Sequence, residues 1–363
     1  MKKIYLTPEY KAKHKRKIKL SLRKLEELNC EIKKNNINTN IATPVIHVKR
    51  NRYTIRFRRL GNRKVRDLIA APIDFRFLDN TDGTIRFFDQ LMDCQNYHYS
   101  RGIKKVKMTL SNVLKIDYAT ISLLISISRN LKSRGIYLFG DFPKEEKSRK
   151  ALIDSGFFEY MRKSNGEKFQ FNTKSRLMFL SKGKKRFLES EDKKMSDELK
   201  DVNYHLTGNK TFLKDVRLVI LEMCANSLEW SDSHDRQWLL GVSLCDGKAV
   251  FTLVDLGKGI LNDLNRKYKD KFSDKINLRN DAEILMRAFD KKYQSQSEEI
   301  NRNKGLPSIK GAVLNNNIGS LIVATNNVIL QINKDETKNV SKILNKEFKG
   351  TFYQWELTKN NNL

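Results

Sequence analysis

Short apolar segments alternate with longer amphipathic segments between residues 70 and 162, and this pattern constrains the fold more than any other feature of the chain. Three segments have the length and composition of strands: IDFRFLD, VKMTLSNV and IYLFGDF. Three others have apolar residues at helical spacing: TIRFFDQLMDCQ, ATISLLISISRNLKSRG and SRKALIDSGFFEYM. Strands that alternate with helices in this way predict a small α/β domain over residues 70–162.

A second mixed unit is predicted over residues 203–358, with a helix over 211–230 and another that begins at Pro307. Its expected strands are WLLGVSL, AVFTLVDL, GSLIVAT, VILQIN and TFYQWEL. Residues 163–202 are rich in Lys, Ser, Glu and Asp, so we interpret them as a linker or connecting region with one strand at SRLMFL. The whole chain is therefore predicted to belong to the α+β class.

Positive charge is concentrated at the start of the chain. The formal net charge is +29, and residues 1–70 hold 21 Lys and Arg against 5 Asp and Glu, which is +16 of that excess. We expect residues 1–69 to form a basic N-terminal region with a helix over 9–34 and a strand at RNRYTIRFRR. Such a region predicts a polyanionic partner, either a nucleic acid or an acidic protein. The side chains expected to contact nucleic-acid phosphates are Lys13, Lys15, Arg16, Lys17, Arg52, Arg56 and Arg58.

Several classes of protein are excluded by the composition. The chain has no run of about 20 apolar residues, so no membrane span is predicted. Its start is basic but lacks the apolar segment of a secretory signal. The 4 cysteines are widely spaced, and the 5 histidines show no zinc-ligand spacing. We therefore expect a soluble, cytoplasmic protein with reduced thiols and no membrane partner.

Polar side chains in the last unit fall into a pattern that indicates a ligand-binding or catalytic site. In LEMCANS, Glu222 and Asn226 are four residues apart, so they share one face of a helix and could orient a water and hold a hard cation such as Mg²⁺. In VDLGKGI, an apolar strand ends at Asp255, which could accept a hydrogen bond from an exocyclic amine. Gly257 and Gly259 would then let the backbone turn close to a ligand.

Two later segments complete the pattern. In NRNKGLPSIKGA, the residues before Pro307 lead into a helix start, where backbone N–H groups favour phosphate, and Lys304 and Lys310 add positive charge. In GTFYQWEL, Gly350 and Thr351 precede the last strand. Each segment is a common pattern by itself, but their order and spacing together are specific.

In this order the segments resemble the N, G1, G2 and G3 boxes of the GHKL superfamily, the ATP-binding fold shared by DNA gyrase B, MutL-type ATPases, histidine kinases and anti-sigma serine kinases. The resemblance covers residues 205–358 and implies a two-layer α/β sandwich that binds ATP and Mg²⁺. It implies that Asp255 receives the adenine amino group, that Thr351 supports the adenine pocket and that Asn226 is the Mg²⁺ ligand.

The same resemblance gives roles to the remaining residues. Glu222 would be the general base, and Gly257 and Gly259 would admit the nucleotide. Residues 261–304 would form the ATP lid. The phosphate-binding residues would be Lys304, Gly305 and Leu306, although of the usual GxGxGL box only Gly305 and Leu306 are kept, and Asn303 stands where an earlier glycine often sits.

The segment over residues 70–162 resembles the STAS fold of anti-sigma-factor antagonists. At the position of that family's phosphorylated serine this chain has Ala119, which follows Asp117 and Tyr118, so the phosphorylation switch is expected to be lost. The resemblance then implies a surface for docking a partner protein or for homodimerisation.

Three functions follow from these resemblances. The first is a slow ATPase that acts as a nucleotide-dependent regulatory switch, and the second is a serine/threonine protein kinase that uses the same Glu222. The third is a non-catalytic nucleic-acid-binding adaptor that senses ATP. Autophosphorylation on histidine is disfavoured because His205, the nearest candidate, has no acidic residue after it.

Overall fold

The computed structural model describes the backbone of residues 44–49, 52–57, 68–101, 105–163, 166–170, 175–181, 189–226, 237–262, 264, 280–290 and 305–362. For residues 44–49, 52–57, 93–101, 175–181, 189, 226 and 237 it describes the backbone alone. The chain divides into two compact units, residues 1–65 and residues 66–363. In the described ranges, none of the helices combines the length and the apolar character needed to cross a membrane.

The described part of the first unit is a β-hairpin. Strand β1 (Pro44–Lys49) pairs antiparallel with β2 (Arg52–Phe57). The strand predicted around residues 52–58 is therefore confirmed, and it carries Arg52 and Arg56. The predicted helix over 9–34 lies outside the described residues, as do Lys13, Lys15, Arg16, Lys17 and Arg58.

The second unit is of mixed α+β type. Its helices are α2 (Thr81–Arg101), α3 (Tyr118–Ser133), α4 (Glu146–Asp154), η2 (Phe157–Glu159), α5 (Glu189–Thr207), α6 (Lys214–Asn226), α8 (Asp281–Phe289), α9 (Gly305–Leu314) and η3 (Glu336–Lys338). Its strands are β3 (Leu68–Ala70), β4 (Asp74–Phe75), β5 (Lys105–Thr109), β6 (Lys115–Ile116), β7 (Tyr137–Phe139), β8 (Ser175–Ser181), β9 (Gln237–Cys245), β10 (Lys248–Asp255), β11 (Leu321–Ile332) and β12 (Val340–Thr358).

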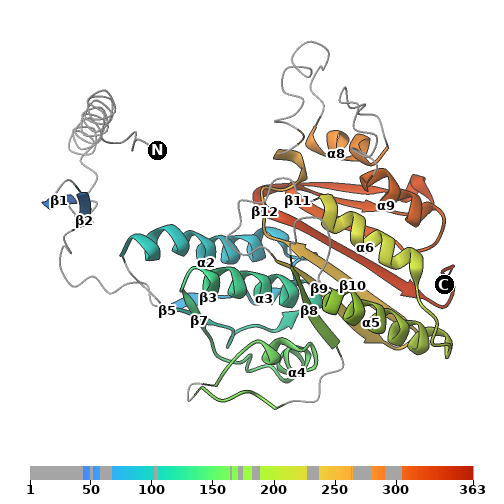
Figure 1. Cartoon of the computed structure of the whole chain (residues 1–363), viewed down its shortest axis with the longest axis horizontal. Coiled ribbons are helices and arrows are strands. Elements are labelled where there is room, and N and C mark those ends of the chain that lie inside the picture. Colours follow the sequence, from blue (N-terminus) through green and yellow to red (C-terminus); the bar gives the residue numbers. More distant parts are fainter. Residues whose placement is uncertain are drawn as a thin grey trace, which may run out of the picture. The chain divides into compact units, whose positions relative to one another are not determined.

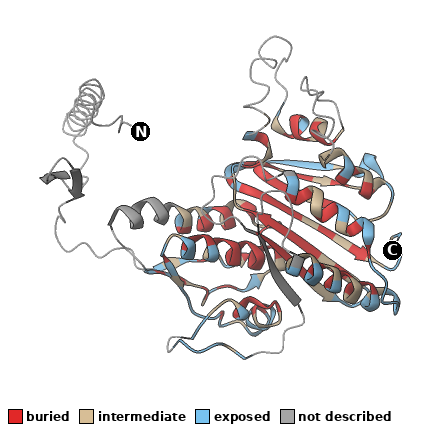
Figure 2. Ribbon diagram, viewed as in Figure 1, coloured by how far each residue is buried: buried red, intermediate tan, exposed pale blue. Residues whose placement is uncertain are grey.

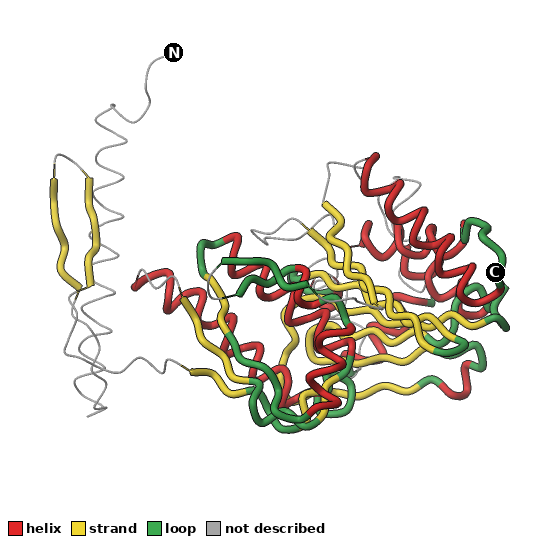
Figure 3. Tube along the Cα trace, turned by 90° about the horizontal axis from the view of Figure 1, so that it is seen from below, coloured by secondary structure: helices red, strands yellow, loops and turns green. Residues whose placement is uncertain are grey.

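A five-stranded antiparallel sheet with the order β11-β12-β10-β9-β8 is the centre of this unit. Helices cover both of its faces (Figures 1 and 3). Because successive strand residues point to opposite faces, neighbours in sequence belong to different cores. Leu253 and Tyr353 pack into the core that includes residues of α5, α6, α8 and α9, whereas Val254 and Phe352 pack into the core that includes residues of α2 and α3.

Burial along the strands follows this arrangement. The central strands are buried over most of their length in Figure 2, because helices lie against both faces. On the α2 side the Phe77 ring lies 5.2 Å from the Phe352 ring, and on the α6 side the Phe251 and Trp355 rings stack at 5.0 Å. Complete burial of one such aromatic side chain stabilises the fold by about 1.5–3 kcal/mol.

A hydroxyl pair joins α3 to the sheet. Ser122 Oγ lies 2.9 Å from Thr252 Oγ1, and both side chains are fully buried. Helix α3 begins where its N-cap residue Asp117 accepts a hydrogen bond from the backbone N–H of Thr120 at 2.7 Å. The segment predicted as a small α/β domain therefore shares its core with the five-stranded sheet.

The part of the chain around α3 contains parallel strands, as the predicted strand–helix alternation requires. Strands β3, β5 and β7 form a parallel sheet with β5 in the middle, and β4 pairs in parallel with β6. Several elements in this part of the chain are shorter than expected. The strands in VKMTLSNV and IYLFGDF are limited to Lys105–Thr109 and Tyr137–Phe139. The strand in IDFRFLD is limited to Asp74–Phe75, and helix α4 ends at Asp154, shortly before Gly156 adopts a left-handed φ of 81°.

The stretch 163–202, expected as a connecting region, has more structure than its composition indicates. The strand expected at SRLMFL is present as β8, and it pairs with β9 at the edge of the five-stranded sheet. Most of α5 also falls in this range, and its buried Met195, Leu199 and Val202 are spaced by four and three residues. The apolar face of α5 is narrow, and charged residues dominate the rest of the helix.

Candidate functional site

The predicted adenine contact lies at the end of a central strand. Asp255 is the last residue of β10, is only 6% exposed and stands opposite Thr351 on β12. Thr351 in turn stands opposite Thr325 on β11, and both threonines are buried. A carboxylate and two hydroxyls therefore occupy neighbouring positions on three adjacent strands.

The glycine before Thr351 allows β12 to come close to Asp255. Gly350 has a φ of 141°, and a Cβ added there would overlap the backbone carbonyl oxygen of Asp255. Because the obstacle is backbone, no side chain can be accommodated by a change of rotamer. The glycine that precedes Thr351 in the sequence is thus required by the packing of β10 against β12.

The turn after Asp255 is fixed by two residues of β11. Thr325 Oγ1 accepts a hydrogen bond from the backbone N–H of Ile260 at 2.9 Å. Asn326 Oδ1 accepts one from the backbone N–H of Leu261 at 3.0 Å, and its Nδ2 donates to the carbonyl oxygen of Lys258 at 2.9 Å. The DLGKG turn is therefore held by a strand about 65 residues further along the chain.

Gly259 is needed at this turn for a reason that its sequence motif does not reveal. Its φ is 82°, and a Cβ there would overlap the carboxamide of Asn326. Gly257 and Gly259 were expected to admit a nucleotide. The structure shows that Gly259 is already required by the Asn326 side chain, and it places Gly257 in the bend after β10.

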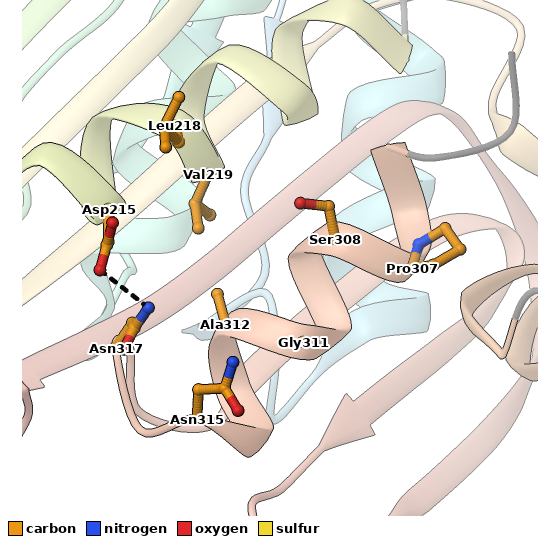
Figure 4. A pocket seen from close by; sticks show the side chains of 9 residues that line it. All are labelled: Asp215, Leu218, Val219, Pro307, Ser308, Gly311, Ala312, Asn315 and Asn317. Carbon is orange, nitrogen blue, oxygen red and sulfur yellow. Dashed lines mark hydrogen bonds between the residues drawn. The ribbon is translucent and has the colours of Figure 1, made fainter. Parts of the chain in front are cut away.

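Helices α6 and α9 carry the other predicted residues and run antiparallel. At one end, Asn317 Nδ2 donates to Asp215 Oδ2 at 3.1 Å, and toward the other end Pro307 and Ser308 lie beside α6 (Figure 4). The C-terminal half of α6, with Glu222 and Asn226, therefore lies toward the N-terminal end of α9. Glu222 is half-buried, and the backbone of Asn226 ends the helix.

The N-terminus of α9 supplies the predicted phosphate-binding residues. Gly305 and Leu306 are its first two residues, and the partly buried Leu306 packs against the core. Lys304 lies outside the described residues. Of the predicted lid, residues 261, 262, 264 and 280–290 are described, and they include α8, whose apolar face is part of the core.

Lys310 was expected to add positive charge for phosphate, but it is paired within the fold. Its side chain is 9% exposed, donates to Asp290 Oδ1 at 2.6 Å and also pairs with Glu336. Burial opposes the charged form, but the two carboxylates outweigh it and raise the pKa of Lys310 above its ordinary value. A charge that is already paired with two carboxylates contributes little to phosphate binding.

A groove lies between α6 and α9 on the side that Figure 4 shows. It has a volume of about 500 Å³. The residues that line it are Asp215, Leu218, Val219, Pro307, Ser308, Gly311, Ala312, Asn315 and Asn317. None of these lining residues is a predicted site residue. The groove and the Asp255 end of β10 are thus formed by different residues.

Thr325 and Asn326 are the residues that sequence reasoning missed. The sequence predicts two separate strands here, GSLIVAT and VILQIN, but β11 runs through the intervening Asn326 and Asn327 with an irregular register, and Asn326 has a φ of 51°. Asparagine is the residue that best tolerates a left-handed conformation after glycine. An asparagine within an apolar strand pattern was therefore the available signal.

Two further predicted features can be located. Ala119, which stands where a phosphorylated serine was expected to be lost, is buried in the first turn of α3. His205 has a ring Nε2 2.7 Å from the carbonyl oxygen of Cys245. In the described part of the chain, no group of three or more His, Cys, Asp or Glu side chains could hold a metal.

Comparisons with known proteins add no identification. No protein-family model matches the chain, and no curated protein matches it.

Proposed function

We propose that residues 203–358 bind Mg·ATP in the manner of the GHKL superfamily. The observation that carries the proposal is the position of Asp255, a buried carboxylate at the end of a central strand and opposite a buried Thr351. A buried carboxylate aligned with hydroxyl groups can accept a hydrogen bond from the amino group of adenine and can reject a base that presents a carbonyl there.

The other predicted residues would bind the rest of the nucleotide. The N-terminus of α9 at Gly305 and Leu306 offers backbone N–H groups to phosphate. Asn226 would supply one oxygen to Mg²⁺, which commonly keeps water and phosphate oxygens as its other ligands. Lys304, just before α9, would add positive charge.

Glu222 is the proposed general base. It lies one helical turn before Asn226 on α6, so that a base and a metal ligand are on the same face of one helix. In that position it would take a proton from an attacking water, which makes slow ATP hydrolysis the expected activity. The protein would then act as a nucleotide-dependent switch, with the basic residues 1–69 directed to a polyanionic partner.

Thermal melts of the full chain test nucleotide binding. At ~100 times its Kd, Mg·ATP is expected to add about 2.7 kcal/mol to the free energy of unfolding of the wild-type protein. Asp255→Asn is expected to abolish this increase. Asp197→Asn, which changes a side chain that is 57% exposed on α5, is the matched control and keeps the increase. Equal ATP responses in wild type and Asp255→Asn would refute the adenine contact.

Turnover is tested with Glu222→Gln in the presence of radiolabelled ATP. If the switch proposal is correct, the variant still shows the ATP-dependent increase in stability but no longer releases phosphate. Label that appears on an added protein rather than as free phosphate would instead support the kinase function. ATP binding without either product would identify an adaptor that only senses ATP.

A further inference from the structure

One face of the parallel sheet β3-β5-β7 is not covered by any helix or strand of the described residues. Parallel sheets are normally covered on both faces. Here the inward residues Val106 and Met108 belong to the core that also contains residues of α2 and α3. The alternate residues of the same strands, such as Lys105 and Lys107, are exposed.

The uncovered face combines aromatic, basic and aliphatic side chains. Tyr137 is 50% exposed, Phe139 is 44% exposed and Leu68 is 58% exposed. The register places Leu68, Lys107 and Phe139 in one row across the three strands, and Lys105 and Tyr137 in the next row. We call these five residues the β3-β5-β7 face.

The spacing within this face brings cations next to rings. Neighbouring strands are ~4.8 Å apart, and side chains two residues apart on one strand are ~6.6 Å apart. Lys105 Nζ lies 5.7 Å from the centroid of the Phe139 ring. Tyr137 and Phe139 are thus side by side on β7, with a lysine beside each of them on β5.

Single exposed apolar side chains are normal on a protein surface, but this arrangement is concentrated on three adjacent strands. Exposed aromatic rings on a sheet, next to basic side chains, are the features that bind single-stranded nucleic acid. The rings stack on unpaired bases, and the cations contact the phosphates. A base pair in a duplex does not present its ring face in this way.

We propose that the β3-β5-β7 face binds single-stranded nucleic acid. Tyr137 and Phe139 would each stack on one base, and Lys105 and Lys107 would contact the backbone phosphates. Charge argues against two other occupants of this face, namely residues 1–65 of the same chain and the same face of a second copy. Residues 1–65 hold 20 Lys and Arg against 4 Asp and Glu, and a second copy of the same face would bring lysines against lysines.

The five residues of this face belong neither to the basic residues 1–65 nor to the proposed ATP site. Its recognition depends on stacking, whereas a basic segment alone acts through phosphate charge and discriminates little between single and double strands. Loss of binding at the face and loss of the ATP response are therefore measured independently. Either proposal can fail while the other stands.

The test uses the full chain and a fluorescein-labelled 12-nucleotide oligo(dT), with binding followed by fluorescence anisotropy. The double variant Tyr137→Ala/Phe139→Ala is expected to weaken binding about tenfold or more, because stacking on one aromatic ring contributes at least several-fold in affinity. The matched control is Tyr204→Ala/Phe212→Ala, which removes rings that are 61% and 40% exposed elsewhere. It is expected to bind as the wild type does.

A second pair of substitutions separates the cations from the rings. Lys105→Gln/Lys107→Gln is expected to reduce the slope of log K against log salt concentration by about 1.4, since each phosphate contact with a single strand contributes about 0.7. A duplex of the same length is expected to lose little affinity when the two rings are removed. Circular dichroism melts of each variant confirm that the fold is kept.

Two results would overturn the proposal. One is oligo(dT) affinity in Tyr137→Ala/Phe139→Ala that stays within twofold of the control variant. The other is a change of sedimentation from dimer to monomer in the ring variant with unchanged oligo(dT) binding, which would make this face a homodimer interface.

Discussion

Thr325 Oγ1 on β11 accepts a hydrogen bond from the backbone N–H of Ile260 at 2.9 Å. The next residue, Asn326, holds both sides of the same turn through the N–H of Leu261 and the carbonyl of Lys258. The backbone that follows Asp255 at the end of β10 is therefore anchored to β11, two strands away in the sheet.

The Asn326 carboxamide is expected to be a main source of stability at this turn. Asn326→Gly keeps access to the left-handed φ of 51° but removes the hydrogen bonds to Lys258 and Leu261. The free energy of unfolding should fall by about 2–3 kcal/mol, because buried backbone groups lose their partners. Urea denaturation measures this value.

Asn316→Gly is the matched control, since Asn316 also has a left-handed φ, at 61°. Its Nδ2 donates to Asn360 at an exposed site, so its loss is expected to lower stability by about 1 kcal/mol or less. Equal losses in the two variants would show that backbone conformation, and not the Asn326 carboxamide, stabilises the turn.

Gly259 gives a prediction of its own. Gly259→Ala must place a methyl group against the Asn326 carboxamide at a φ of 82°, so we expect a loss of about 2–4 kcal/mol. Gly135 also has a left-handed φ, at 76°, but a Cβ there has open space around it. Gly135→Ala should therefore lower the free energy of unfolding by only about 1 kcal/mol.

The difference between these two alanine variants isolates the steric contact from the backbone strain that both share. Guanidinium denaturation of the two proteins measures that difference. If both variants lose the same stability, the Asn326 side chain moves away without loss and Gly259 is required for its conformation alone.

Most of the regular elements of the second unit could be predicted from periodicity. The exceptions are segments whose burial depends on distant partners. Strand β12 extends from Val340 to Thr358, but most of its first ten residues are exposed and four of them are charged, so they lack the alternation of a half-buried strand. Their pairing with β11 is visible only in the fold.

Only part of the candidate site could be predicted, because some of its contacts also depend on distant partners. Asp255 and Thr351 stand out because a polar residue ends or begins an apolar strand. The pairing of Lys310 with Asp290 and Glu336 was not predictable, since the three residues lie on different elements and meet only after the chain has folded. Local sequence patterns identify side chains that could bind a ligand or take part in catalysis, but they do not show which of these side chains are already paired within the fold.

The buried contact between Ser122 on α3 and Thr252 on β10 predicts coupling between the two layers. Ser122→Ala should lower the free energy of unfolding by about 1–2 kcal/mol, because it leaves the buried Thr252 hydroxyl without its partner. Thr252→Val should lower it by only about 1 kcal/mol, because the Ser122 hydroxyl still donates to the carbonyl oxygen of Tyr118 at 3.0 Å. The double variant should lose about 1 kcal/mol less than the sum. A double-mutant cycle by urea denaturation gives the coupling energy, and full additivity would mean that the two hydroxyls do not interact.

The buried Lys310 predicts a loss of stability at alkaline pH. Because its carboxylate partners raise its pKa above the ordinary value in the folded protein, its contribution is fully present below the pKa of an unfolded lysine. That contribution is lost as the pH rises through the higher, folded-state pKa. At pH 7, Lys310→Met should lower the free energy of unfolding by about 2–3 kcal/mol, an effect moderated because Glu336 is 54% exposed.

Melting curves of wild type and Lys310→Met from pH 7 to pH 12 measure this dependence. The stability difference between them should narrow at the alkaline end, because the wild-type lysine loses the charge that the methionine lacks throughout. Lys338→Met is the control, since Lys338 is 75% exposed and should contribute less than about 0.5 kcal/mol. A difference between wild type and Lys310→Met that stays constant across this range would mean that the lysine acts through its packing and not through its charge.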